Sequence, residues 1–342
     1  MENPLEKSKN IIYNVISCYE FDKESKGVVK VINNTTKVAI IGCGFVGAST
    51  AFALAMKGTV SKLVLIDVNR DKAEGEAMDI NHGLTYLNQM DIYAGDYSDV
   101  KDCDVIIVTA GMNRKPGETR LDLAKKNSKV AKEIAQNIMK YYNGGVILVV
   151  SNPVDIMTYM IQKESGLPAS KVIGTGTILD SSRLRYILSQ QMEVDVRSIH
   201  GYIVGEHGDS QIPVWSTVNV AGIPCDEFCN NHGVQLDKDA IMEDVKTAGA
   251  QVIQKKGTTH YAISAAVCRL VEALIKNQNT VLPVSSVVTG KYGVESAAFS
   301  LPCIINSTGI TRILEVNYSE NERALLEESA AKLRKVLDEV AN

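Results

Sequence analysis

The sequence predicts an α/β protein in which a doubly wound parallel sheet is followed by an α+β domain. In the first half, short apolar runs alternate with helical patterns, and this order implies parallel strands joined by crossover helices. In the second half, helical patterns are mixed with runs of alternating polarity. A chain of 342 residues can hold two such domains. We therefore expect domains at 35–175 and 176–342, after an extension at 1–34 that forms a loose helix or remains disordered.

The strands of the first half are short and rich in β-branched residues. Lys37–Ile41 is the first, and a glycine-rich turn separates it from a helix at Val46–Lys57, which Gly58 ends. Lys62–Asp67 is the second strand. The later elements are strands at Asp104–Thr109 and Gly145–Val150, with a long helix at Leu121–Tyr142 between them.

The second half contains longer helical patterns. Its last helix is expected to begin after Ser319, whose hydroxyl can cap a helix N-terminus. Apolar residues then recur at helical spacing, which predicts an amphipathic helix. They are Leu326, Ala330, Leu333, Leu337 and Val340. The other elements are helices at Ser181–Gln191, Asp237–Lys256 and Ala262–Asn277, and strands at Thr280–Thr289 and Ala298–Ile305.

Composition argues against several classes of function. The formal net charge of −4 lacks the basic excess expected of a nucleic-acid-binding protein. The seven cysteines are scattered without C-x-x-C spacing, so we expect free thiols, mostly in the core, in a reducing cytoplasm. Cys225 and Cys229 lack a second ligand pair at a zinc-like distance, so no metal is expected. No run of 18 apolar residues could cross a membrane, and no membrane partner is expected.

The glycine-rich turn has the spacing of a dinucleotide site. Gly42 to Gly47 reads G-x-G-x-x-G between a strand and a helix, and Asp67 ends the next strand about 20 residues further on. The glycines would let the backbone approach a pyrophosphate at the helix N-terminus. Asp67 would accept hydrogen bonds from the ribose and repel a 2′-phosphate, which favours NAD over NADP. The alternative is a glycine turn that only packs a helix on a sheet.

One histidine lies in a segment suited to acid–base chemistry. His207 has glycines on both sides, at Gly205 and Gly208, which leave its imidazole uncrowded. Asp180 and Arg183 occur together near the start of a helix. A buried carboxylate would orient the imidazole and raise its pKa, and an arginine can bind a substrate carboxylate with two hydrogen bonds. A lone histidine is more often structural, and these neighbours favour the catalytic interpretation.

A second basic cluster follows a strand, in the segment 109–120. Gly111, Pro116 and Gly117 predict a hinged loop, on which Arg114 and Arg120 could cover a bound anion. A solvated turn is the alternative interpretation of this segment.

Five segments in this order resemble the L-lactate/L-malate dehydrogenase family. They are GCGFVGAS, TAGMNRKPGETRLDL, SNPVD, GTGTILDSSRLR and GEHGDS, and the resemblance runs from about residue 35 to the end of the chain. It implies a Rossmann-type NAD-binding domain followed by a catalytic domain. It also implies reversible hydride transfer between NADH and a small 2-keto acid.

The resemblance assigns a role to each residue of the site. His207 would donate a proton to the substrate carbonyl, with Asp180 as its partner. Arg183 would bind the substrate carboxylate, and Arg120, on the mobile loop, would polarise the carbonyl. Asn152 would donate a hydrogen bond near the carbonyl. The peptide bond between Asn152 and Pro153 is expected to be cis. The implied cofactor contacts are Gly42, Gly44, Val46, Gly47, Asp67, Lys72, Tyr97, Gly111, Met112 and Asn152.

Two residues give conflicting indications of the substrate. Arg114 occupies the position that selects the substrate side chain, where bacterial lactate dehydrogenases usually have glutamine and malate dehydrogenases have arginine. Thr259 and the loop Lys115–Leu123, which follows Arg114, resemble lactate dehydrogenases instead. We expect a lactate-dehydrogenase-type enzyme whose Arg114 confers use of oxaloacetate, because pyruvate would leave a buried guanidinium unpaired. A lactate dehydrogenase that prefers pyruvate is the alternative.

A further resemblance concerns regulation. In bacterial lactate dehydrogenases that fructose 1,6-bisphosphate activates, an arginine and a histidine occupy the places of Arg185 and His200 and bind phosphate between subunits. This implies a homotetramer with an effector site, and two ordinary surface residues are the alternative. Two other classes of protein are alternatives that fit the sequence less well. An NAD-dependent glycosidase would need a metal held by cysteine and histidine, and an NAD-binding sensor would have no reason to keep the four catalytic side chains together.

Overall fold

The structure, a computed structural model, describes residues 19–20, 30–31, 35–112 and 117–340. The chain forms two compact units, Met1–Thr36 and Lys37–Asn342. In the first unit, the described residues form two short antiparallel strands, β1 (Tyr19–Glu20) and β2 (Lys30–Val31). The other residues of the predicted extension lie outside the described part of the chain.

Six parallel strands form the first half of the second unit. Their order across the sheet is β5-β4-β3-β6-β7-β8, so the direction of winding reverses between β3 and β6. Open sheets of this kind bind ligands beyond the carboxyl ends of the strands, at the point where the order reverses. The bounds are β3 (Lys37–Ile41), β4 (Lys62–Ile66), β5 (Asp91–Ala94), β6 (Val105–Val108), β7 (Val146–Val149) and β8 (Val172–Gly174).

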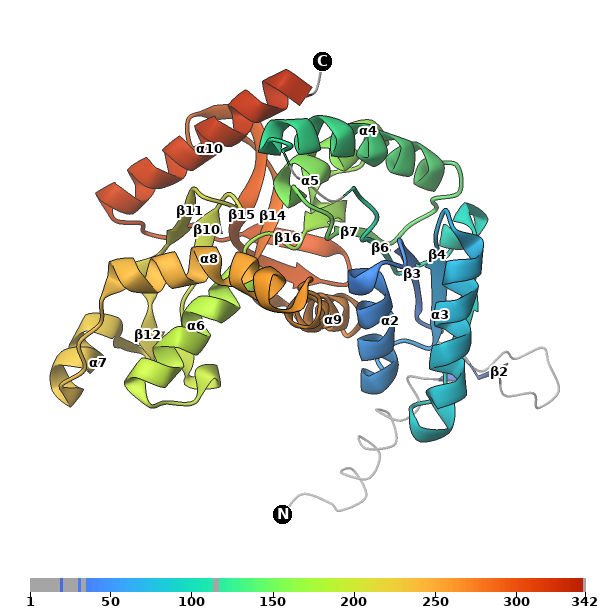
Figure 1. Cartoon of the computed structure of the whole chain (residues 1–342), viewed down its shortest axis with the longest axis horizontal. Helices are drawn as coiled ribbons and strands as arrows, with labels where there is room; N and C mark the ends of the chain where they lie inside the picture. Colours follow the sequence, from blue (N-terminus) through green and yellow to red (C-terminus); the bar gives the residue numbers. More distant parts are fainter. Residues whose placement is uncertain (1–18, 21–29, 32–34, 113–116, 341–342) are drawn as a thin grey trace, which may run out of the picture. The chain divides into compact units, whose positions relative to one another are not determined.

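Helices cover this sheet, and their caps are visible in the sequence. Gly58 ends α2 in the left-handed conformation, and Asn69 caps the N-terminus of α3. Thr119 and Asp122 form a reciprocal capping box at the start of α4. The helices are α2 (Phe45–Lys57), α3 (Arg70–Gly83), α4 (Arg120–Met139) and α5 (Val154–Ser165). Figure 1 shows α4 and α5 together with the C-terminal helix α10 along the top of the view, away from α2 and α3.

The second half combines helices with two long antiparallel strands. The helices are α6 (Ile178–Met192), α7 (Cys225–His232), α8 (Lys238–Lys256), α9 (Tyr261–Ile275) and α10 (Glu320–Val340). The strands are β9 (Ile199–His200), β10 (Ile203–Gly205), β11 (Gln211–Pro213), β12 (Asn219–Val220), β13 (Ile223–Pro224), β14 (Thr280–Lys291), β15 (Val294–Asn306) and β16 (Gly309–Ile313). Ser319 caps α10 by accepting a hydrogen bond from the Glu322 backbone, as predicted.

One sheet runs through both halves of the second unit. β14 pairs with β8, and the Cα partners are Ser285 and Gly174. The antiparallel strands β14, β15, β10 and β11 thereby extend the parallel sheet, and with β16 the sheet has 11 strands. Strands from both sides of residue 175 belong to this one sheet. The division into two domains at this residue therefore stays a prediction.

The cysteines in the described part of the chain are free thiols in the core. Six cysteines are free and buried: Cys43, Cys103, Cys225, Cys229, Cys268 and Cys303. Cys18 lies outside the described residues. Cys225 and Cys229, on α7, belong with Phe228 to an apolar cluster that also contains residues of α6 and α8. Among the described residues, no helix has the length and apolar character needed to span a bilayer.

Candidate active site

The glycine-rich turn lies between β3 and α2, where the order of the sheet reverses. Gly42 has a φ of 103°, and a Cβ on it would lie 2.6 Å from the backbone nitrogen of Ala110. A Cβ on Gly47 would collide with the carbonyl oxygen of Gly42. Gly44 has open space around it and is the N-cap of α2. The turn therefore packs closely on the loop after β6 and leaves the α2 N-terminus open to a phosphate.

Asp67 follows β4 directly, at the position predicted for the ribose contact. Its Oδ2 accepts a hydrogen bond from the Cys43 backbone N–H at 2.6 Å, and its Oδ1 accepts one from the Asn69 backbone N–H at 2.9 Å. These two bonds fix the carboxylate beside the glycine turn. Each oxygen keeps a lone pair that can accept a hydrogen bond from a ribose hydroxyl.

A cavity of about 320 Å³ opens beside Asp67. Ile41, Tyr97 and Ile134 are among its lining residues, with Arg70 and Glu133 at polar positions. The walls suit the flat, largely apolar adenine ring of a dinucleotide. Tyr97 lines this cavity, whereas Lys72 is exposed on α3 and does not line it; the contact of either residue with the cofactor stays a prediction. The glycine cradle, the anchored carboxylate and the cavity together fit NAD.

The loop after β6 is held at its start by a buried side chain that sequence reasoning missed. Asn127, on α4, accepts a hydrogen bond from the Met112 backbone N–H at 2.8 Å and donates to the carbonyls of Met112 (3.1 Å) and Asn152 (2.6 Å). It joins the start of this loop to the loop after β7. Gly111 and Met112 are exposed at that point, and their contact with the cofactor stays a prediction. Arg114, the predicted specificity residue, lies outside the described residues.

The loop after β7 carries Asn152. The bond between Asn152 and Pro153 is cis, which confirms the prediction from the resemblance. The side chain of Asn152 is exposed, and its Oδ1 accepts a hydrogen bond from the Val154 backbone N–H at 3.3 Å. Its amide nitrogen therefore remains available as a donor to a ligand.

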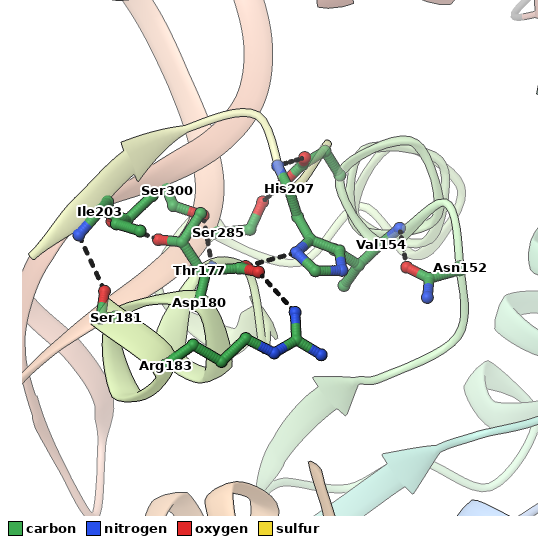
Figure 2. A network of polar contacts seen from close by, with 11 residues as sticks. Asn152, Val154, Thr177, Asp180, Ser181, Arg183, Ile203, His207, Ser285 and Ser300 are labelled. Atoms are coloured by element: carbon green, nitrogen blue, oxygen red, sulfur yellow. Dashed lines mark hydrogen bonds and ion pairs between the residues drawn. The ribbon is translucent and has the colours of Figure 1, made fainter. Parts of the chain in front are cut away.

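His207 and Asp180 are in direct contact, as predicted. His207 Nδ1 lies 2.6 Å from Asp180 Oδ2, and Arg183 donates to Asp180 Oδ1 at 3.0 Å. Figure 2 shows Asp180 between the imidazole and the guanidinium. The Asp180 side chain is 2 % exposed, while those of His207 and Arg183 are 25 % and 19 % exposed. The carboxylate is thus covered, while the two side chains that would contact a substrate reach the surface.

This geometry shifts the pKa values of both His207 and Asp180. The negative charge of Asp180 is the largest influence on His207 and raises the pKa of its imidazole to about 9, against the opposing effect of burial. Burial alone would raise the pKa of Asp180, but the His207 and Arg183 charges and hydrogen bonds outweigh it and lower that pKa. The pair therefore stores a proton on the imidazole at neutral pH, next to an anion-binding guanidinium.

Arg120 lies near this pair, though its position differs from the expected one. The resemblance placed it on the mobile loop, whereas it is the first residue of α4, because the Thr119 capping box starts the helix there. Its guanidinium forms an exposed ion pair with Asp209, at 2.7 and 2.9 Å. Asp209 belongs to the segment of His207, so the pair brings α4 to the catalytic segment. Sequence reasoning did not single out Asp209.

Helix α8 of the second half lies next to Arg183. A Cβ built on Gly249 of α8 would lie 3.4 Å from the Arg183 guanidinium, so the glycine leaves room for this side chain. Thr259 is half-buried in the turn between α8 and α9. Its contact with a substrate stays a prediction.

The proposed effector residues lie on neighbouring segments of the second half. Arg185, on α6, donates a hydrogen bond to the Val196 carbonyl at 3.2 Å. His200 is exposed on β9, which directly follows the short helical turn Val196–Ser198. Their role as an effector site stays a prediction, since it needs a second subunit.

The fold and the site define an NAD-dependent oxidoreductase. A doubly wound sheet holds a dinucleotide cradle, and a carboxylate-oriented histidine lies with an arginine in the adjoining half. Family models match nearly all of the second unit: the NAD-binding domain of lactate/malate dehydrogenases at residues 36–174, and their alpha/beta C-terminal domain at 177–342. The chain belongs to the lactate/malate dehydrogenase family.

Its relatives include enzymes with known names and structures. An L-lactate dehydrogenase of Thermoanaerobacter sp. (strain X514) is 49% identical over 307 residues, which covers 89% of this chain and 99% of the relative. The crystal structure of a lactate dehydrogenase from a Medee basin deep-sea metagenome library matches with a TM-score of 0.87 and 42% identity, over 90% of this chain and 99% of that one. L-lactate dehydrogenase from Clostridium thermocellum matches with a TM-score of 0.81 and 58% identity, over 90% and 100%.

Proposed function

We propose that this enzyme transfers a hydride reversibly between NADH and a small 2-keto acid, with His207 as the proton donor in reduction. The observation that carries the proposal is the chain of contacts from His207 through Asp180 to Arg183. A protonated imidazole and a guanidinium, both partly exposed, then flank the same buried carboxylate. These are the groups that a keto acid needs, since it has one carbonyl to protonate and one carboxylate to bind.

Each side chain has a defined task in this reaction. The bound NADH supplies the hydride. Arg183 holds the substrate carboxylate, and His207 gives its proton to the carbonyl oxygen as that oxygen gains negative charge. Asp180 keeps the imidazole in one orientation and stabilises its charged form. Arg120 exchanges its exposed partner Asp209 for the carbonyl oxygen, whose developing charge it stabilises. The amide of Asn152 donates a hydrogen bond near the same carbonyl.

The substrate we propose is oxaloacetate, because of Arg114. Oxaloacetate carries a second carboxylate, whereas pyruvate carries a methyl group. An arginine that faces this end of the substrate gains an ion pair with oxaloacetate and remains an unpaired, partly desolvated charge with pyruvate. A difference of about 3 kcal/mol would give a preference of roughly a hundredfold.

A specific observation favours a second candidate, an L-lactate dehydrogenase that prefers pyruvate. The relatives at 46 to 49% identity are named L-lactate dehydrogenases. Thr259 also suits the small end of pyruvate. The two candidates share the catalytic residues and differ only in what Arg114 contacts.

One experiment separates them. The values of kcat/KM for oxaloacetate and pyruvate are measured with the unmodified enzyme, with Arg114→Gln, and with Arg197→Gln as a matched control. Arg197 is exposed on a surface turn and pairs with Asp195, so its loss changes the charge of the protein without touching the pocket. We expect a preference for oxaloacetate that Arg114→Gln reverses. A preference for pyruvate in the unmodified enzyme would refute the role of Arg114, and reduction of neither acid would refute the function.

Assembly, regulation and location are further parts of the proposal. We propose a homotetramer in which fructose 1,6-bisphosphate binds between subunits through Arg185 and His200. The two residues lie on adjacent segments of α6 and β9, and a phosphorylated sugar would need cations of this kind. The buried free thiols support a location in the reducing cytoplasm.

A further inference from the structure

A second carboxylate lies against the segment of His207, and the reaction described above does not use it. Asp155 lies in the first turn of α5 and is 3% exposed. Its Oδ2 accepts a hydrogen bond from the His207 backbone N–H at 2.8 Å, and its Oδ1 accepts one from Ser285 Oγ at 2.6 Å. One buried carboxylate therefore joins α5, the catalytic segment and β14.

Hydrogen bonding alone does not require an acid at this position. Both donors are neutral, and an asparagine could accept from the His207 N–H while donating to Ser285 Oγ. Burial of a carboxylate is costly, and here it raises the pKa of Asp155 to about 6 in spite of the two hydrogen bonds. The carboxylate is still ionised at neutral pH, so its charge needs a cation nearby.

The protonated His207 is the cation whose charge acts on Asp155: it lowers the pKa of this carboxyl, and Asp155 in turn raises the pKa of the imidazole. The charged groups around the imidazole come from three segments: Asp180 and Arg183 on α6, Asp155 on α5, and Glu206 next to the histidine. The Glu206 carboxylate is turned to the hydroxyl and backbone of its own segment. The remaining two carboxylates balance the guanidinium and the imidazolium. When the imidazole loses its proton, this buried group is left with one uncompensated negative charge.

We propose that Asp155 is a positioning residue that fixes the backbone of His207 and supplies a second negative charge that stabilises the protonated imidazole. This inference rests on the proposed function, in which the protonated form donates the proton. Asp180 acts on the ring through Nδ1, whereas Asp155 acts through the backbone bond and through its field. Ser285 holds the carboxylate in place from the opposite side.

The test is the substitution Asp155→Asn, which is isosteric and retains both hydrogen bonds. Keto acid reduction requires the protonated His207, so kcat/KM is constant at low pH and falls as pH rises through the imidazole pKa. Loss of the second negative charge should move this falling limb to lower pH by roughly one unit. Reduction should therefore fall about fivefold near pH 9, approach a tenfold decrease at higher pH, and change little below pH 7. Thr158→Val is the control, since Thr158 is fully buried in the same helix and bonds only to the Val154 carbonyl.

The position of the falling limb decides the inference. A limb that moves in Asp155→Asn and stays in Thr158→Val supports the inference. A limb that does not move in Asp155→Asn, with any loss of activity equal at all pH values, overturns it and leaves the proposed function intact. An NMR titration of the His207 imidazole in the NADH complex, assigned by its absence in His207→Asn, measures the same quantity without a keto acid. A shift in that titration, in an enzyme that reduces neither acid, would support the inference and refute the proposed function.

Discussion

Replacement of Asp180 by asparagine should make the enzyme's activity fail at high pH and persist at low pH. The amide oxygen can still accept the hydrogen bond from His207 Nδ1, so the orientation of the ring is retained. What is lost is the negative charge, which is the largest influence on the imidazole. The pKa of His207 is therefore expected to fall from about 9 towards or below the ordinary value of 6.5.

The size of the effect follows from the two pKa values. At pH 8, a group with a pKa of about 9 is about 90% protonated, and one with a pKa of 6.5 is about 3% protonated. The value of kcat/KM for keto acid reduction should thus drop roughly thirtyfold at pH 8. At pH 6 both forms are mostly protonated, so the decrease from this cause should be less than about twofold. The loss of the Arg183 ion pair adds a decrease that does not depend on pH.

The assay follows NADH oxidation at varied keto acid concentrations between pH 6 and pH 10. It gives the pH at which kcat/KM begins to fall. Asp209→Asn is the control for the position of this falling limb, because it removes an exposed carboxylate of the same segment that pairs with Arg120 and not with the imidazole. The limb should move in Asp180→Asn alone. An Asp180→Asn enzyme that is impaired by the same factor at every pH would show that Asp180 acts by orientation only, and the electrostatic argument would be wrong.

Three further predictions concern the cofactor and the effector. NADH should be preferred to NADPH because Asp67 repels a 2′-phosphate, and Asp67→Ser should reduce the ratio of the two kcat/KM values; an unchanged ratio would count against this role. Gly42→Ala should lower the free energy of unfolding by more than about 1 kcal/mol and should also lower the affinity for NADH. Gly44→Ala should weaken NADH binding but leave the stability nearly unchanged, because its Cβ meets open space. Fructose 1,6-bisphosphate should lower the substrate KM and tighten subunit association, and both responses should be lost in Arg185→Gln and His200→Gln; an enzyme that ignores the sugar has no effector site there.

Much of the fold could be predicted because local patterns agree with it. The strand Lys37–Ile41 was predicted with its observed bounds, and Gly58 and Ser319 marked the ends of helices through their caps. The helix α3 was missed because it is largely polar and its small residues, such as Ala73 and Ala77, give a weak apolar pattern. The strand β8 has three residues, which is too few for a period to be recognised.

The catalytic pair was predictable for a different reason from the residues around it. His207 and Asp180 stand out by residue type and by resemblance, whereas Asn127 and Asp155 are defined by what they contact. Both of these are buried polar residues among the apolar residues of a helix, and a polar residue in such surroundings is the signal that sequence analysis could have used. The partner of Arg120 could not be predicted, because Asp209 reaches it through an exposed contact between distant segments.

The pairing of β14 with β8 sets an order of events while the chain is being made. β8 ends at Gly174 and β14 begins at Thr280, so at about 5 to 20 residues per second the ribosome needs roughly 5 to 20 seconds to pass from one to the other. During this interval the edge of β8 has no partner strand, and open edges of this kind associate with other chains. The nascent protein is then most prone to aggregate through this open edge. The hydroxyl that anchors the carboxylate behind the histidine belongs to Ser285, so the catalytic segment reaches its final geometry only after this interval ends.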